Sequence, residues 1–550
     1  MIREEIKKLI EKSIKELQKE KIFPKFDIPE IQIEHPEEKA HGDYATNVAM
    51  VIAKEIKKNP IEIANLLGLK FKVKGLRYFD KVEIAEPGFI NLFLSKEYLQ
   101  NQVGEILKQG EKFGQLKVGK NQRVDIEFCS ANPTGPLHLG HGRGAFWGDA
   151  LSNVFEKAGY KVTREYFIND YGKQILLLGK SIDARYKEIL GQKVEIGEDF
   201  YKGEYIKDIA NEIIKKEKDK YLKLSGEERI KVFTEVGLEK MLREAKKLLE
   251  KVGVKYDVWF SEKKLYKEDL VKKAVESLKN KGFTYEKEGA LWFVSTKFGD
   301  DKDRVLIKAD GEPTYFASDV AYHLNKVSRK YDLMINGWGA DHWGYKPRLM
   351  ATAKVLGFDQ KLKIIVGQFV RLVEKGKEVK MSKRGGTFVA LEDLINEVGS
   401  DVARFFFLIK SVDTHIDFNL DLAEEQSDKN PVYYIQYAHA RICSILRKLK
   451  NSESRIQNLE LLNHPSELGL IKQLIRLSEV IEDTAKDYQV QRIPQYAMDL
   501  ATIFHQFYRD CRVISEDKNL TQARLSLVLA TKTVLKNTLD LMGISAPEKM

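Results

Sequence analysis

The chain has 550 residues, of which 43% are hydrophobic and 32% are charged. This length predicts three or four domains at roughly 100 to 200 residues each, and the net charge of +10 permits a polyanionic partner without demonstrating one. Three scattered cysteines, Cys129, Cys443 and Cys511, exclude a disulfide framework and a zinc knuckle. We therefore expect a reducing, cytoplasmic setting.

Residues 1–116 are predicted to form a small α+β module. Apolar residues recur at helical spacing over residues 2–17, and the dense charge between them is unlike a signal peptide. Residues 82–85 and 89–93 are typical of a strand pair around Pro87-Gly88. No apolar run in the chain approaches the length of a membrane span, so we expect no membrane association.

The chain is organised around residues 123–147, RVDIEFCSANPTGPLHLGHGRGAFW. Apolar and acidic residues alternate over 124–128, which predicts a short strand of an α/β sheet. Residues 132–136, Asn-Pro-Thr-Gly-Pro, stop that strand because proline lacks an N–H donor. His138 then begins a predicted helix.

Two motifs have residues that could bind a nucleoside triphosphate. His138-Leu139-Gly140-His141 places two imidazoles and free backbone N–H groups at a helix N-terminus, where phosphate is favoured, and Gly140 admits a flat base. Residues 380–386, Lys-Met-Ser-Lys-Arg-Gly-Gly, supply cations for a leaving pyrophosphate. Either motif alone could be a structural histidine or a solvated basic turn. The two together, in this order, are far more specific.

A doubly wound parallel sheet is predicted over residues 117–400. Residues 160–166 complete a βαβ unit, and residues 175–285 look like a Lys/Glu-rich helical insertion. The sheet is expected to resume with residues 291–294, 304–307, 333–337 and 363–368. Tyr315 and Asp319, four residues apart, share one face of a helix start.

From residue 401 onward strand signals fade and helical patterns dominate. Residues 401–550 are therefore predicted to form an all-α bundle whose apolar stripes are its core. Periodicity alone gives no reason to assign RNA binding to this bundle.

These motifs resemble those of the arginyl-tRNA synthetases, which are class I aminoacyl-tRNA synthetases. Residues 138–141 are similar to the HIGH box and residues 380–384 to the KMSKS box. The arginine-type resemblance lies in residues 127–136, 169–172, 315–319, 339–342, 434–441 and 543–550, with Lys549 where arginine is usual. It covers nearly the whole chain, including an N-terminal module that other class I members lack.

The resemblance implies a Rossmann-like catalytic domain and a two-step reaction. ATP with Mg²⁺ would activate L-arginine to arginyl-adenylate, and the arginyl group would pass to the 3′ terminal ribose of tRNA(Arg). It further implies a monomer, no structural zinc and no metal ligands in the protein. In many relatives bound tRNA is needed before arginine is activated, and we carry this over as a hypothesis.

The resemblance also assigns roles by position. The predicted catalytic residues are His138, His141, Lys380, Ser382 and Lys383. The predicted ATP-binding residues are Pro133, Gly135, His138, Gly140, His141, Asp341, His342, Met381 and Lys383. Arginine would be held by Glu127, Asn132, Tyr315 and Asp319, since carboxylates pair well with a guanidinium.

Two domains would meet the tRNA. The module at 1–116 would reach the D-loop at the elbow, and the bundle at 401–550 would read the anticodon. The weak candidates for these contacts are Asn91, Tyr434, Tyr437, His439 and Arg441.

Two alternatives remain at this stage. A different class I synthetase, for instance a cysteinyl enzyme, would need a zinc-ligand set that three scattered cysteines cannot supply. A tRNA-binding regulator that kept the fold but lost catalysis would show damage to the two phosphate motifs, and both are whole.

Overall fold

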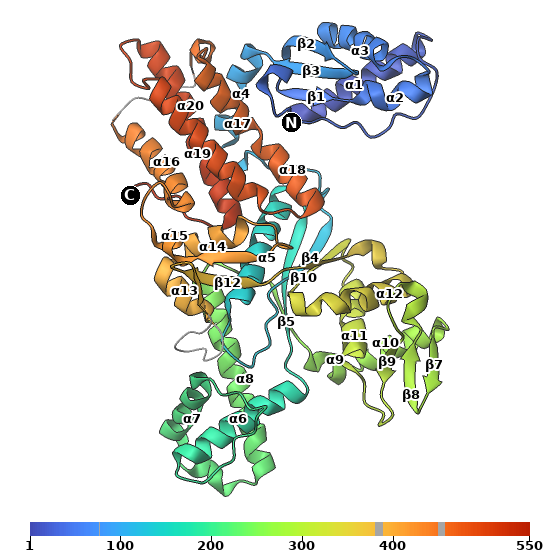
Figure 1. Cartoon of the computed structure of the whole chain (residues 1–550), viewed down its shortest axis with the longest axis vertical. Coiled ribbons are helices and arrows are strands. Elements are labelled where there is room, and N and C mark those ends of the chain that lie inside the picture. The colour runs from blue at the N-terminus through green and yellow to red at the C-terminus, as the bar shows by residue number, and fades with distance from the viewer. Residues whose placement is uncertain (76, 380–388, 449–456) are drawn as a thin grey trace.

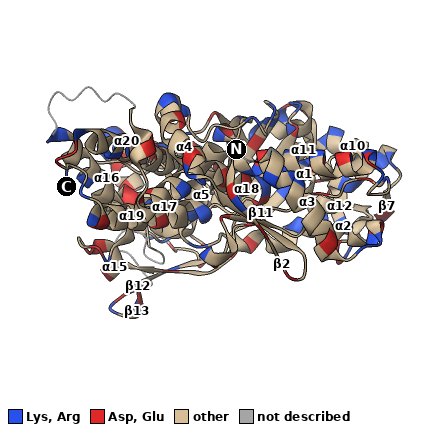
Figure 2. Ribbon diagram, turned by 90° about the horizontal axis from the view of Figure 1, so that it is seen from above, with Lys and Arg blue, Asp and Glu red and all other residues tan. Residues whose placement is uncertain are grey.

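The computed structural model describes residues 1–75, 77–379, 389–448 and 457–550. Figure 1 shows a central sheet region, a group of long C-terminal helices above it with the N-terminal module beside them, and a helical arm at the bottom. Figure 2 shows both signs of charge interspersed along the helices. In the described part of the chain, no helix has both the length and the apolar character needed to cross a bilayer.

The N-terminal module is the predicted α+β unit. Its three strands form an antiparallel sheet in the order β1-β3-β2, of which β1 was not predicted. Asn59 caps α3 by accepting a hydrogen bond from the Ile61 N–H, and Pro60 occupies the first turn, where its missing N–H costs nothing. The elements are α1 (Ile2–Lys19), β1 (Tyr44–Thr46), α2 (Val48–Ile56), α3 (Pro60–Lys74), β2 (Phe79–Ala85), β3 (Phe89–Leu94) and α4 (Lys96–Gln109).

The middle part of the chain contains a parallel sheet whose strands run in the order β11-β10-β4-β5-β6. These strands are β4 (Arg123–Glu127), β5 (Lys161–Ile168), β6 (Val258–Ser261), β10 (Leu333–Trp338) and β11 (Leu362–Val366). Val124 and Ile126 are fully buried, and α5 (Leu139–Lys157) connects β4 to β5. The chain winds outward from β4 in both directions, so the switch point lies between β4 and β10. The predicted doubly wound sheet is confirmed.

The membership of this sheet differs from the prediction in two places. Strand β6 belongs to it, although it lies inside the range 175–285 that was expected to be helical. The prediction for residues 291–294 and 304–307 was wrong, because β8 (Ala290–Phe293) and β9 (Arg304–Ile307) form a separate antiparallel sheet with β7 (Thr284–Lys287). Glu288 and Gly289 both have positive φ, and such a two-residue turn produces a hairpin rather than a parallel crossover.

The helical arm is formed by α6 (Lys173–Ile189), α7 (Glu204–Glu217) and α8 (Gly226–Lys251), at the bottom of Figure 1. It has its own apolar core, which includes Leu178, Ile182, Tyr186, Ile209 and Phe233. Ser225 and Glu228 cap the start of α8 reciprocally. The chain returns to the sheet through β6 and continues through α9 (Lys263–Lys267), α10 (Leu270–Asn280), α11 (Tyr315–Ser328) and α12 (Lys346–Leu356).

A second small sheet lies next to the N-terminal end of α5. It has the order β13-β12-β14, with β12 (Val370–Glu374) parallel to β14 (Ile416–Asn419) and antiparallel to β13 (Lys377–Val379). Strand β14 was not predicted. The helices that accompany it are α13 (Leu391–Val398), α14 (Ser400–Leu408) and α15 (Leu420–Glu424).

A C-terminal helical bundle is confirmed, but not over the whole predicted range 401–550, because strand β14 lies inside that range and pairs with β12. It consists of α16 (Pro431–Arg447), α17 (Pro465–Ile475), α18 (Leu477–Asp487), α19 (Arg492–Asp510) and α20 (Lys518–Met542). Asn430 caps α16, and the apolar stripe of α19 is buried at Ala497, Leu500, Phe504 and Phe507. Helices α17, α19 and α20 pack on one another, and α17 and α20 also pack on α4, which joins the N-terminal module to the bundle.

Candidate active site

A cavity of about 1150 Å³ opens at the carboxyl ends of the parallel strands. Glu127 at the end of β4 and Trp338 at the end of β10 both line it, so it lies at the switch point of the sheet. Its other walls come from the N-terminus of α5, from β12 and from the short helix Ala340–Tyr345. Open α/β sheets bind their ligands at this place.

The turn after β4 is conformationally unusual. Cys129 and Ser130 both have positive φ, at 68° and 34°, which non-glycine residues rarely adopt. The Ser130 hydroxyl donates to Glu127 Oε1 at 3.2 Å and accepts from the Phe167 N–H at 3.1 Å. These contacts hold the turn against its strain and direct the following loop over the cavity.

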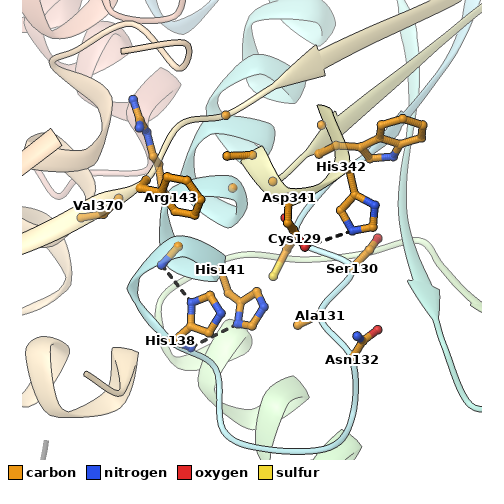
Figure 3. A pocket seen from close by; sticks show the side chains of 18 of the residues that line it. Cys129, Ser130, Ala131, Asn132, His138, His141, Arg143, Asp341, His342 and Val370 are labelled. Carbon is orange, nitrogen blue, oxygen red and sulfur yellow. Dashed lines mark hydrogen bonds and ion pairs between the residues drawn. The ribbon is translucent and has the colours of Figure 1, made fainter. Parts of the chain in front are cut away.

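His138 and His141 lie side by side at the start of α5 (Figure 3), with ring centroids 3.5 Å apart. His138 Nδ1 accepts from the Gly140 N–H at 3.1 Å, and His141 Nδ1 accepts from the His138 N–H at 3.2 Å. Burial lowers the pKa of both imidazoles, that of His141 well below its ordinary value. We infer that both rings are neutral and carry their proton on Nε2, which makes each a hydrogen-bond donor.

The loop of residues 132–136 crosses one side of the cavity. Asn132 lies on the lining of the cavity (Figure 3), where its Nδ2 donates to Gln174 Oε1 at 3.0 Å and its Oδ1 accepts from Asn169 Nδ2 at 3.1 Å. Pro133 and Gly135 belong to this loop but do not line the cavity, whereas Gly140 does.

Two acidic side chains that influence one another, Asp319 and Glu262, also line the cavity. Asp319 lines the cavity, and its pKa is raised to about 7 by burial and by Glu127, against the opposing charge of Arg348. Glu262 is 3% exposed, its Oε2 has no hydrogen-bond partner, and burial together with Asp319 and Asp170 raises its pKa to about 8. No cation in the described ranges pairs with either carboxylate. This wall therefore suits a cationic ligand.

The rim beside these carboxylates is aromatic. Tyr315, in the first turn of α11, lines the cavity and is 51% exposed. A Cβ on Gly172 would lie 3.2 Å from the Tyr315 hydroxyl, so the glycine leaves room for that ring.

Glu127 is placed differently from the other predicted arginine ligands. Its Oε2 lies 2.7 Å from the Nζ of Lys326, a fully buried lysine that also pairs with Asp125 at 2.7 Å and donates to Asn336 at 3.1 Å. The lysine is held charged by these carboxylates, which raise its pKa. Glu127 lines the cavity but already has an internal cation.

Asp341 and His342 lie on the short helix after β10 (Figure 3) and are exposed. His342 Nε2 is 3.5 Å from Asp341 Oδ2, and the negative charge of Asp341 acts on His138 across the cavity. The structure thus brings the HIGH-like motif, Asn132, Tyr315, Asp319, Asp341 and His342 to one cavity.

The remaining predicted residues are elsewhere. Lys380, Met381, Ser382 and Lys383 lie outside the described residues. Asn91 is buried in β3 and His439 is buried in α16, where its Nδ1 contacts the Pro547 carbonyl. Tyr437 is 38% exposed, Arg441 lies over its ring at 4.6 Å, and Tyr434 packs on His505.

Sequence reasoning missed Glu262 and Lys326. Glu262 stands in the charged run Glu262-Lys263-Lys264, which reads as a solvated surface. The signal that could have found it is its position directly after the apolar run of β6, where a parallel strand ends. In the part of the chain that the structure describes, no group of three or more His, Cys, Asp or Glu side chains could hold a metal ion.

Three family models match the chain in order. They are the arginyl tRNA synthetase N terminal domain over residues 4–94, the catalytic domain of class I (R) tRNA synthetases over residues 102–421, and the DALR anticodon binding domain over residues 435–550. The catalytic model alone covers more than half of the chain.

Whole-chain relatives agree. An arginine–tRNA ligase of Caldanaerobacter subterraneus subsp. tengcongensis is 47% identical over 555 residues, covering 100% of this chain and 99% of its own length. That of Bacillus licheniformis is 45% identical over 553 residues with the same coverage. The arginyl-tRNA synthetase of Thermus thermophilus has the same fold, with a TM-score of 0.80 at 21% identity and 100% of both chains covered. The chain belongs to the arginyl-tRNA synthetase family of class I aminoacyl-tRNA synthetases.

Proposed function

We propose how this chain carries out arginine–tRNA ligation, the reaction of its family. The carboxylate of arginine attacks the α-phosphate of ATP and pyrophosphate leaves. A hydroxyl of the 3′ terminal ribose of tRNA(Arg) then attacks the carbonyl carbon of the arginyl-adenylate, and AMP leaves as the ester forms. The substrate supplies the nucleophile, so catalysis rests on positioning and on charge stabilisation. Mg²⁺ enters with ATP as part of the substrate.

The residues at the start of α5 bind the α-phosphate of ATP. His138 and His141 donate from Nε2 to oxygens of the α-phosphate as their charge grows, and the dipole of α5, whose N-terminus lies here, adds to this. Lys380, Ser382 and Lys383 meet the β- and γ-phosphates. Met381, Gly140, Asp341 and His342 contact the nucleoside part.

The arginine side rests on one observation above all. Asp319 and Glu262 present carboxylates without a cation partner among the described residues, in a cavity where burial makes an uncompensated charge costly. A guanidinium offers the planar set of donors that pairs best with carboxylates. Tyr315 covers the guanidinium, and Asn132 holds the α-amino group with its amide oxygen.

Glu127 supports this pocket indirectly. Because Lys326 already satisfies its charge, Glu127 acts on the guanidinium as a negative neighbour of Asp319 rather than as a bidentate partner. The pocket then accepts one external cation at Asp319 and Glu262.

The tRNA meets both ends of the chain. The module at 1–116 approaches the D-loop, and the bundle at 401–550 reads the anticodon with exposed aromatic and cationic side chains such as Tyr437 and Arg441. Residues 117–400 carry the chemistry. The protein acts as a cytoplasmic monomer.

The decisive test is arginine-dependent exchange of labelled pyrophosphate into ATP by the purified protein, with and without cognate tRNA, and with the other amino acids as controls. Exchange with arginine only in the presence of tRNA supports both the assignment and the requirement for tRNA. Exchange with arginine alone retains the enzyme and removes that requirement. Silence with every amino acid, tRNA included, would favour a regulator that lost catalysis.

A further inference from the structure

The loop that carries Asn132 is held by the helical arm. Tyr205, near the start of α7, donates its hydroxyl to the Thr134 carbonyl at 2.9 Å. Gln174 of α6 accepts from Asn132 at 3.0 Å. The arm and the substrate-binding loop are thus joined directly, although Thr134 and Tyr205 are 71 positions apart in the sequence.

The surroundings of Tyr205 are shaped for this contact. A Cβ on Gly203 would lie 2.4 Å from the Tyr205 ring, and a Cβ on Gly135 would lie 3.2 Å from its hydroxyl, so two glycines make room for the side chain. The other side of the ring packs against the apolar core of the arm. Burial raises the pKa of the phenol, so the hydroxyl remains a donor.

A backbone hydrogen bond connects Thr134, the residue that Tyr205 contacts, to Asn132. The Thr134 N–H donates to the Asn132 carbonyl at 2.8 Å, which closes a tight turn between the two residues. On the sheet side, the Tyr166 hydroxyl donates to the Ala131 carbonyl at 3.0 Å. Tyr166 therefore holds the loop to the sheet, and Tyr205 holds it to the helical arm.

We propose that Tyr205 is a positioning residue for arginine binding, which holds the Asn132 amide in place through the Thr134 carbonyl. This proposal rests on the role given to Asn132 in the proposed function. It adds that the helical arm takes part in forming the amino-acid site, although no residue of α7 lines the cavity.

The test compares two Tyr→Phe variants of the full chain. Y205F removes only the hydroxyl that contacts the loop. Y186F is the matched control, because the buried Tyr186 hydroxyl donates to the Lys218 carbonyl at 2.7 Å within the same arm and away from the loop. Both variants lose one tyrosine-to-carbonyl hydrogen bond and keep the ring.

Pyrophosphate exchange by the wild-type protein is measured first, with tRNA present, so that failure of the proposed function is seen separately. In Y205F we expect the KM for arginine to rise about 5-fold, the effect of one lost hydrogen bond, with the KM for ATP and kcat nearly unchanged. In Y186F we expect all three parameters to match the wild type, with a thermal midpoint no higher than that of Y205F.

A third variant changes a loop residue that contacts Tyr205. In G135A the new methyl group would press on the Tyr205 hydroxyl, so we expect the same rise in the KM for arginine and no further rise in the double variant with Y205F. An active wild-type enzyme with equal KM values for arginine in Y205F and Y186F would overturn the proposal. A rise in the KM for ATP as large as that for arginine would overturn it too.

Discussion

At the scale of single residues, the acidic wall of the cavity makes arginine binding depend on pH. The pKa is raised to about 7 for Asp319 and to about 8 for Glu262, so both carboxyls hold protons over part of the neutral range in the free protein. A bound guanidinium favours the ionised carboxylates, so binding releases protons. We expect the KM for arginine to fall as the pH rises from about 6 to about 8.5, by up to tenfold per pH unit for each proton released.

Asp319→Asn tests the origin of this pH dependence. The variant lacks one of the titrating groups, so we expect a higher KM for arginine and a shallower decrease with pH. The KM for ATP, measured over the same pH series, is the internal control. A KM for arginine that is independent of pH in the wild-type protein would contradict the proposed carboxylate wall.

The two imidazoles differ from these carboxyls because their pKa is lowered, so they remain neutral across this pH range. His141→Asn keeps an acceptor close to the position of Nδ1 but lacks a donor at Nε2. His141→Gln keeps an amide N–H near Nε2. We expect the Asn variant to lose about 100- to 1000-fold in the kcat of pyrophosphate exchange, and the Gln variant to retain more activity. More activity in the Asn variant, which keeps the acceptor of the helix cap, than in the Gln variant would mean that His141 acts only as a helix cap.

At the scale of elements, Arg143 joins α5 to the sheet of β12 and β14. Its side chain is 2% exposed and donates to the carbonyls of Gln368 at 2.8 Å and of Ser411 and Thr414 at 2.6 Å. Burial lowers its pKa to about 10, so it remains charged at neutral pH. These bonds set the width of the cavity between the histidines of α5 and the wall formed by Phe369, Val370 and Leu372.

Arg143→Gln is expected to raise the KM for ATP by at least tenfold, because each hydrogen bond from a charged donor contributes about 1.5–3 kcal/mol. The KM for arginine should change little. Arg164→Gln is the control, since Arg164 of β5 anchors the other half of α5 by donating to Asn153 at 2.9 Å and to Glu156 at 2.6 Å. A similar KM for ATP in both variants would show that Arg143 only stabilises the fold.

The elements also show where sequence patterns stop being informative. Short apolar strand patterns located β4, β5, β10 and β11, and the Pro/Gly-rich segment located the loop before α5. Alternation does not name a partner strand, so β8 and β9 were placed in the wrong sheet. Strand β6 has four residues and lies at a sheet edge, which is too short for a periodic signal.

The candidate site also has one part that the sequence predicts and one part that it does not. Its phosphate side is local in sequence, so residues 138–141 could be predicted from one helix start. Its arginine side is assembled from three separate segments, and the difference between Glu127 and Glu262 depends on where Lys326 lies in the folded chain. Only the tertiary structure decides which carboxylate is already neutralised.

At the scale of the whole molecule, ionic contacts hold the N-terminal module against the C-terminal bundle. Glu479 of α18 is 3% exposed, and it accepts from the Tyr44 hydroxyl at 2.8 Å while its other oxygen lies 2.7 Å from His35 Nε2. Arg3 of α1 donates to Asp483 at 2.9 Å, and Lys472 pairs with Asp43 at 2.6 Å. A few buried or half-buried polar pairs thus add to the packing of α4 on α17 and α20 in fixing the two regions proposed to bind tRNA.

We expect Glu479→Ala to loosen this contact, because it leaves Tyr44 and His35 without their partner, at a cost of about 1–3 kcal/mol for each unsatisfied group. Amide hydrogen exchange should increase in residues 30–47 and stay the same in β4 and α5. The KM for tRNA should rise several-fold, while the KM for arginine remains that of the wild type. Lys486→Ala is the control, since Lys486 and Glu30 form an exposed pair at 3.3 Å in the same interface and such pairs contribute about 0–1 kcal/mol. If Glu479→Ala and Lys486→Ala had the same exchange pattern and the same KM for tRNA, the buried glutamate would have no special part in holding the module to the bundle.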